Sequence, residues 1–148
     1  MVAELSIDAI TAAVAILQSG DRCAGKLELQ RLWNDGFETD PYRRCIIAHF
    51  LADTEEDVAM ELAWDIAALE AATGRAEGDA DPLAPALASF LPSLHLNVGD
   101  AYRRIGNLEQ ARFHAKAGLR RASVLEENGY GSMIKTGLDR LHMRTEAD

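Results

Sequence analysis

The chain has 148 residues, which suits one domain large enough to bury a core of its own. Its formal net charge of −9 argues against nucleic acid as the main partner, because nucleic-acid binders present basic surfaces. Hydrophobic residues make up 48% and aromatic residues only 6%, a composition typical of Ala- and Leu-rich helices rather than of a sheet. No run of 18 apolar residues occurs, so we expect no membrane span and no membrane partner.

The first residues and the cysteines bear on the compartment. No basic region followed by an apolar core stands at the N-terminus, so we predict no signal peptide. The two cysteines, Cys23 and Cys45, have neither metal-site nor redox-motif spacing, and we interpret both as buried free thiols. We therefore expect a cytoplasmic protein.

The charge is distributed unevenly along the chain. Residues 1–102 carry 6 basic and 18 acidic side chains, a net −12, whereas residues 103–148 carry 9 basic and 6 acidic ones, a net +3. Solvated helix faces explain such a pattern most simply. Head-to-tail association and a dipolar partner are the alternatives.

The first predicted helix spans about 7–19, and Gly20-Asp21 breaks it. A second helix follows over about 22–34, so that the two form a hairpin over about 6–37. The apolar residues of the two helices are Ile7, Ile10, Val14 and Leu17, then Leu27, Leu29, Leu32 and Trp33.

A second hairpin is predicted over about 41–73. Asp40 is a suitable N-cap, and Pro41 stands at the first helical position, where its missing N–H does no harm. The sequence TEED after residue 53 then predicts a cap with acidic residues in the first turn of the next helix, which ends at about residue 72. The main apolar residues are Ile46, Ile47, Phe50 and Leu51, then Val58, Leu62, Trp64, Ile66, Ala67 and Leu69.

An insertion over about 74–91 interrupts the spacing. Residues 74–81 are polar, rich in glycine and acidic, which predicts an exposed loop. A short helix is expected over about 82–91. Pro92 should then begin the next helix or kink it away from the short one.

The third hairpin, over about 92–125, has the clearest pattern. Gly106 supplies the positive φ that ends a right-handed helix, and Asn107 can begin the next one. A last amphipathic helix is predicted over about 131–145, with Met133, Ile134, Leu138 and Leu141 facing inward. Small residues at Gly99, Ala111, Ala115 and Gly118 should let the two helices of the hairpin approach closely.

The third hairpin resembles a tetratricopeptide repeat (TPR), of the kind found in small bacterial-type TPR domains. The resemblance rests on the order and spacing of Val98, Gly99, Tyr102, Gly106, Leu108 and Ala111. Ile16 and Leu51 fall on the Tyr102 position of two weaker repeats and are 35 residues apart, close to the family period of about 34. The family's large aromatic in the second helix is replaced by Ala115, and Gly118 stands where Ala is usual. The resemblance implies an all-α fold, a right-handed α-solenoid of three TPR-like hairpins plus a C-terminal capping helix.

The resemblance also implies a function. In this family the first helices of the repeats line a concave face that binds proteins or peptides. We therefore expect a non-catalytic scaffold for a protein or peptide partner, with no cofactor and no metal. One family subtype binds a C-terminal carboxylate, but of its positions only Asn97 carries a suitable residue, so we do not assign the chain to it. The residues predicted for the partner-binding face are Tyr42, His49, Asn97, Asp100, Arg103 and Arg104.

Two alternatives remain open. The apolar surface of the helices can instead close a homodimer with no ligand in the groove. The other is a small-ligand or metal-dependent enzyme that uses His49, Asp53 and Asp100, because His49 and Asp53 stand at i, i+4. A structural role is the simpler interpretation of His95, His114 and His142.

Overall fold

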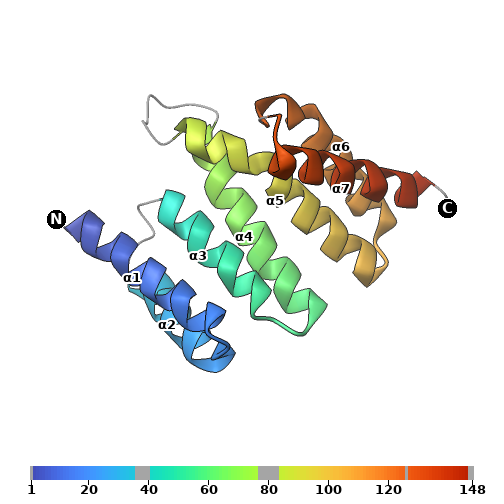
Figure 1. The fold of residues 1–148 in the computed structure, drawn as a ribbon. Helices are drawn as coiled ribbons and strands as arrows, with labels where there is room; N and C mark the ends of the chain where they lie inside the picture. Colours follow the sequence, from blue (N-terminus) through green and yellow to red (C-terminus); the bar gives the residue numbers. More distant parts are fainter. Residues whose placement is uncertain (1, 36–40, 77–83, 126, 147–148) are drawn as a thin grey trace.

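The computed structural model describes residues 2–35, 41–76, 84–125 and 127–146, and within these ranges the fold is all-α, without a strand (Figure 1). Successive helices lie side by side, and each packs chiefly against its neighbours in the chain. The elements are α1 (Val2–Gln18), α2 (Arg22–Asn34), α3 (Pro41–Asp53), α4 (Val58–Ala76), α5 (Ala84–Ile105), α6 (Leu108–Arg120), the short 3-10 helix η2 (Ala122–Val124) and α7 (Gly129–Glu146).

The α1–α2 and α5–α6 turns have the same geometry. Gly20 and Gly106 have φ values of +103° and +100°, in the left-handed region that glycine enters without steric cost. The next residues, Asp21 and Asn107, cap α2 and α6, since each side-chain oxygen accepts a backbone N–H three residues later at 3.1 Å. The predicted helix breaks at both positions are confirmed.

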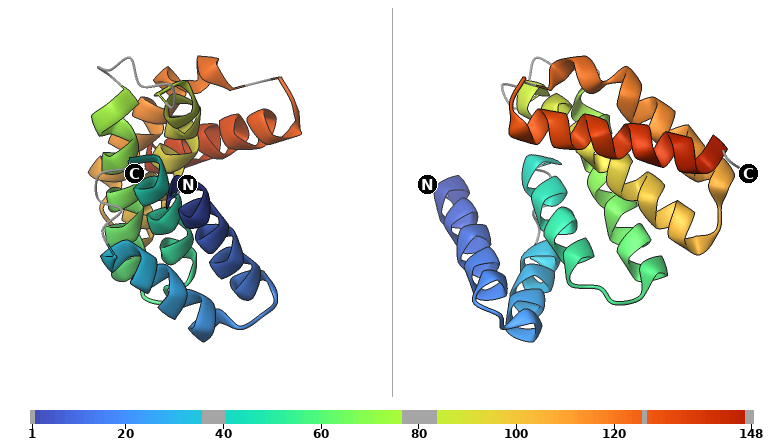
Figure 2. Two further views of the ribbon diagram at one scale, coloured as in Figure 1. Left: turned by 90° about the vertical axis from the view of Figure 1, so that its left-hand side faces the viewer. Right: turned by 45° about the vertical axis from the view of Figure 1, so that its right-hand side comes forward.

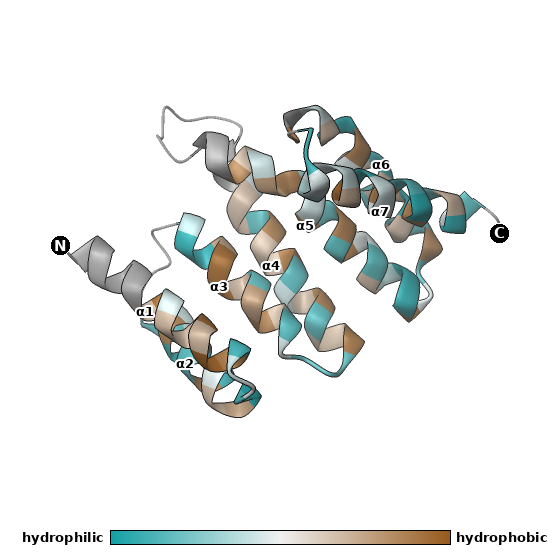
Figure 3. Cartoon of the chain, viewed as in Figure 1, coloured by the Kyte–Doolittle hydropathy of each residue, from teal (hydrophilic) through white to brown (hydrophobic). Residues whose placement is uncertain are grey.

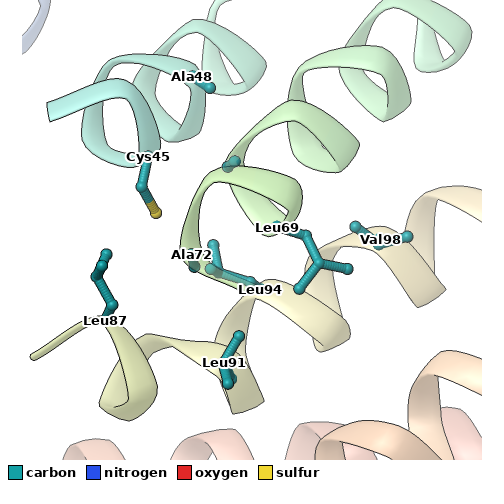
Figure 4. Packing of buried hydrophobic residues seen from close by; sticks show 9 residues of the cluster. Cys45, Ala48, Leu69, Ala72, Leu87, Leu91, Leu94 and Val98 are labelled. Carbon is teal, nitrogen blue, oxygen red and sulfur yellow. The ribbon is translucent and has the colours of Figure 1, made fainter. Parts of the chain in front are cut away.

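The core is continuous from one helix pair to the next. One cluster lies between α3, α4 and α5 (Figure 4) and a second between α1, α2 and α3. Trp33 and Trp64 border both clusters and meet edge to face, with ring centroids 5.1 Å apart. Figure 3 shows hydrophobic and hydrophilic residues on each of the helices α2 to α7, so each has a face to bury. The fully or nearly fully buried members are Cys45, Ala48, Ala68, Leu69, Ala72, Leu87, Leu91, Leu94 and Val98 in the first cluster, and Ile10, Ala13, Leu29, Leu32, Ile47 and Leu51 in the second.

The helix α7 packs on α6 and α5, across which it runs in Figures 1 and 2. Its buried stripe includes Ile134, Leu138 and Leu141, as predicted, but Met133 is 60% exposed. The prediction for Met133 is wrong because one residue rotates the side chain by about 100°, away from the stripe at i, i+4 and i+7.

The predicted insertion is partly helical. Residues 74–76 belong to α4, whereas 77–83 lie outside the described residues. The prediction of a separate short helix before Pro92 is wrong, because α5 continues through the proline as one element. Leu87 and Leu91 share a buried face with Leu94 and Val98 against α4. Burying two leucines stabilises the helical continuation by about 3–6 kcal/mol, which offsets the roughly 3 kcal/mol cost of an internal proline.

Other boundaries and faces also differ from prediction. The helix α1 begins at Val2 rather than near residue 7, and the predicted N-cap Asp40 lies outside the described residues. Leu27 is 66% exposed rather than in the core, and Cys23 is exposed, whereas Cys45 is buried as predicted. The differences at Leu27 and Cys23 concern which side of α2 meets a neighbour, a property that local spacing does not fix.

Candidate functional site

A cavity of about 230 Å³ lies between α3, α5 and α7. Each helix contributes residues from one face: the spacing i, i+3, i+4, i+7 on α5 and i, i+4 on α7 aligns side chains over successive turns. Most of the lining is apolar, and the polar groups of the lining residues are a thiol, an imidazole, a serine hydroxyl, a side-chain amide and a phenol. The lining residues are Cys45, Ile46 and His49 from α3, Phe90, Ser93, Leu94 and Asn97 from α5, and Tyr130 and Ile134 from α7.

The polar groups of the cavity are not set up for nucleophilic chemistry. Burial raises the pKa of the Cys45 thiol to about 12, so the thiol stays protonated at neutral pH. Figure 4 shows this side chain pointing toward the α4 and α5 residues of the core cluster. The His49 ring packs edge-on against Phe50, with centroids 5.3 Å apart, and the Ser93 hydroxyl donates a hydrogen bond to the Phe90 carbonyl at 3.0 Å. No hydrogen bond joins the thiol, imidazole and hydroxyl within the described ranges.

Asn97 connects the cavity to a shallower groove between α5 and α7. This residue lines the cavity and also both neighbouring hollows. Gly137 keeps the two helices close there, because a Cβ on it would lie 2.8 Å from Cδ2 of Leu96. We call this the α5–α7 groove, and its lining residues are Leu96, Asn97, Asp100, Gly137, Arg140, Leu141 and Arg144.

The structure brings together part of the predicted partner-binding face. His49 and Asn97 line the cavity, and Asp100 lines the α5–α7 groove. Tyr42 instead packs against the core between α3, α4 and α5, with its ring 6.1 Å from that of Phe90.

The two predicted arginines take part in ion pairs. Nη2 of Arg103 lies 3.0 Å from Oδ1 of Asp100, and Nε of Arg104 lies 3.0 Å from Oδ2. Arg104 also pairs with Glu61, and so links α5 to α4. The contacts with Asp100 lie within α5, and both guanidinium groups are already engaged.

The α7 side of the cavity was missed from sequence. The last helix was predicted to begin at about residue 131, so Tyr130 fell outside it, and this helix was assigned as a cap with no part in the binding face. The i, i+4 spacing of Tyr130 and Ile134 was the sequence signal that could have placed Tyr130 in the cavity lining, since Ile134 belongs to the buried stripe of α7.

Two polar features, one buried and one half-buried, lie outside the cavity and its groove. Asp65 on α4 is only 4% exposed and its Oδ2 has no hydrogen-bond partner. Burial raises its pKa to about 7, and repulsion by Glu61 and Asp53 adds to the shift. His95 and His114 face each other between α5 and α6, whereas each was assigned a separate structural role from sequence.

The described residues hold no set of three His, Cys, Asp or Glu side chains suited to a metal ion. Within the same ranges, no helix combines the length and apolar character needed to cross a bilayer. Comparison of the chain with family models, curated proteins and solved structures finds no match.

Proposed function

We propose that this chain is a non-catalytic scaffold that binds a protein or peptide on the concave face of a short right-handed, TPR-like solenoid. In this proposal the pairs α1–α2, α3–α4 and α5–α6 are the three repeats, and α7 is the cap. The matching turns at Gly20 and Gly106 support equivalence of the first and third pairs. Packing of each helix on its chain neighbours is what a repeat protein requires.

The cavity between α3, α5 and α7 carries the proposal. The helices α3 and α5 would be the first helices of their repeats, so the cavity lies where the family's binding face is expected. Its volume of about 230 Å³ is below the roughly 300–1,000 Å³ typical of small-molecule sites. A cavity of this size and apolar lining suits one anchoring side chain of a larger partner.

Two properties of the cavity favour binding over catalysis. The Cys45 thiol, with a pKa raised to about 12, is a poor nucleophile at neutral pH. His49 has an aromatic neighbour in Phe50 rather than a carboxylate that would orient it as a general base.

Filling the cavity tests this function. Ser93→Leu adds apolar volume from the cavity wall, so we expect it to displace an anchoring side chain. Phe113→Ser is the control, because Phe113 is 56% exposed on α6 and does not line the cavity. Immobilised wild-type and variant proteins would be exposed to an extract of the native cell, and bound proteins quantified by mass spectrometry. A specific partner should be retained by wild type and control but lost from Ser93→Leu. Equal retention by all three would reject the cavity as the binding site.

Exposed side chains on α7 favour a homodimer as the second candidate. Tyr130, Met133 and Met143 are each more than half exposed, and a second copy of the chain would cover this apolar surface. Light scattering over a concentration series would detect a dimer. A strict monomer at high concentration would remove this candidate.

A further inference from the structure

We infer that the partner segment combines one large apolar anchor with acidic residues, the anchor entering the cavity and the carboxylates meeting Arg140 and Arg144 in the α5–α7 groove. This inference rests on the proposed function and specifies the chemistry of its partner. Two observations support the inference. The first is which charged residues of the groove already form ion pairs, and the second is the distance from the cavity to the charged residues that do not.

Arg140 and Arg144 are the available charges of the groove. In the part of the chain that the structure describes, neither forms an ion pair, whereas Arg103 and Arg104 both do. The two unpaired residues stand one helical turn apart on α7, and both line the same hollow. Guanidinium groups in such a position bind carboxylates through paired hydrogen bonds.

Asp100 does not neutralise this pair of arginines. Among the described residues it is the one acidic residue that lines the α5–α7 groove, and its two carboxylate oxygens bind Arg103 and Arg104 at 3.0 Å each. The groove therefore has an excess of positive charge in a chain whose net charge is −9. An acidic ligand is repelled by most of the surface and attracted here, which orients its approach.

The geometry also sets the spacing of the ligand. Ile134 borders the cavity, and Arg140 and Arg144 follow it by 6 and 10 residues on α7. At 1.5 Å per residue these arginines stand about 9 and 15 Å along the helix from Ile134. An extended peptide rises about 3.3 Å per residue, so its acidic residues should lie about three to five positions from the anchor.

Selection from a display library of short random peptides tests the inference directly. Peptides retained by wild-type protein should share one large apolar residue with Asp or Glu about three to five positions away. The most enriched peptide would then be synthesised and its affinity measured by fluorescence anisotropy at low and at physiological salt. The double variant Arg140→Glu/Arg144→Glu should weaken binding about tenfold or more, and added salt should weaken it in wild type.

Lys116→Glu/Lys135→Glu is the matched control. It makes the same change in net charge, but both lysines are exposed and line neither the cavity nor the groove. We expect it to weaken binding less than about twofold. Equal weakening by the two double variants would overturn the inference, because only long-range charge would then matter.

Other outcomes separate the inference from the proposed function. In one of them the selected peptides share an apolar anchor without being enriched in Asp or Glu, and Ser93→Leu abolishes their binding. This result would overturn the inference and leave the proposed function standing. Failure to select any peptide would overturn the inference, while capture from the cell extract still decides the proposed function. A wild-type dimer that Arg140→Glu/Arg144→Glu converts to monomer would show a second copy of the chain in the groove, and would also overturn it.

Discussion

The Nδ1 atoms of His95 on α5 and His114 on α6 lie 3.0 Å apart. At this separation one imidazole donates its Nδ1 proton and the other accepts it, so the accepting ring must be neutral. His114 also stacks on Tyr102, with centroids 5.7 Å apart. Burial lowers the pKa of both rings, that of His95 to about 4, and repulsion by His114 adds to the shift for His95.

The histidine pair should make the protein less stable in mild acid. Below the ordinary pKa of 6.5 an unfolded His95 takes up a proton, but the folded one does so only near pH 4. The unfolded state therefore binds more protons in this window, and the free energy of unfolding falls as the pH drops from about 6.5 to about 4. We expect a loss of roughly 1–3 kcal/mol. His95→Phe/His114→Phe should flatten this part of the profile, measured by denaturant unfolding at a series of pH values. An unchanged difference between wild type and variant across the window would contradict the neutral pair.

Asp65 should have the opposite pH dependence. Its folded carboxyl keeps a proton up to about pH 7, while the unfolded one loses it near 3.8. Between these values the unfolded state binds fewer protons, so the free energy of unfolding falls as the pH rises. The side chain of the Asp65→Asn variant cannot ionise, so the variant should gain stability relative to wild type as the pH rises across this window. The pH-dependent gain in the free energy of unfolding should reach about 2–4 kcal/mol and level off above pH 7.

The control for Asp65 is Glu70→Gln, an exposed acidic residue on the same helix. Its stability relative to wild type should change little with pH. If Asp65→Asn likewise shows no pH-dependent gain, the carboxyl has a partner or a solvent path in solution, and its burial in the structure would not describe the protein at neutral pH.

Features that depend on a residue's own backbone chemistry were predicted well from sequence. The turn at Gly106-Asn107 follows from a positive φ and an N-cap, and both are found. Helix α3 begins at Pro41, where proline is tolerated because the first helical N–H needs no partner. The small residues Gly99 and Ala111 are buried at the α5–α6 crossing, since close packing admits no larger side chain there.

Features that depend on which helix lies opposite were not predictable in the same way. His95 and His114 are 19 residues apart, and their bond depends on how far α5 and α6 rotate toward each other. Tyr130 reaches the cavity because α7 runs across α5, an angle that no local spacing encodes. Pro92 was predicted to begin a helix or to kink it, from its local effect alone, yet α5 continues through it with leucines buried on one face.

Gly25 should tolerate no side chain. A Cβ there would lie 2.6 Å from Cγ of Leu17 and 3.0 Å from its backbone nitrogen, an atom that cannot rotate away. Gly25→Ala therefore forces α1 and α2 apart, and we expect a net loss of roughly 1–2 kcal/mol after the better helix propensity of Ala is included. Gly129→Ala is the control, because its Cβ would meet nothing within 4 Å. Denaturant unfolding measures both, and a Gly25→Ala variant as stable as wild type would contradict the close approach of α1 and α2.

The two cysteines should differ sharply in reactivity. Cys23 is exposed on α2, whereas Cys45 is buried in the cavity wall with its pKa raised from 9.0 to about 12. Because the thiolate is the reactive species, this shift lowers the thiolate fraction of Cys45 at neutral pH about a thousandfold, and burial slows alkylation further. Iodoacetamide followed by mass spectrometry should therefore add one group quickly and the second only on unfolding.

The Cys23→Ser variant completes this test, because it should show no fast adduct. Rapid modification of Cys45 in that variant would mean that the cavity opens to solvent far more than the structure allows. Such opening would also weaken the case for a single buried anchor, since an anchoring side chain gains affinity only where it displaces little ordered water and meets a preformed apolar wall. The opposite result is slow alkylation of Cys45 whose rate changes neither when a peptide is bound nor in Ser93→Leu. It would show that the wall around Cys45 is rigid before any partner arrives.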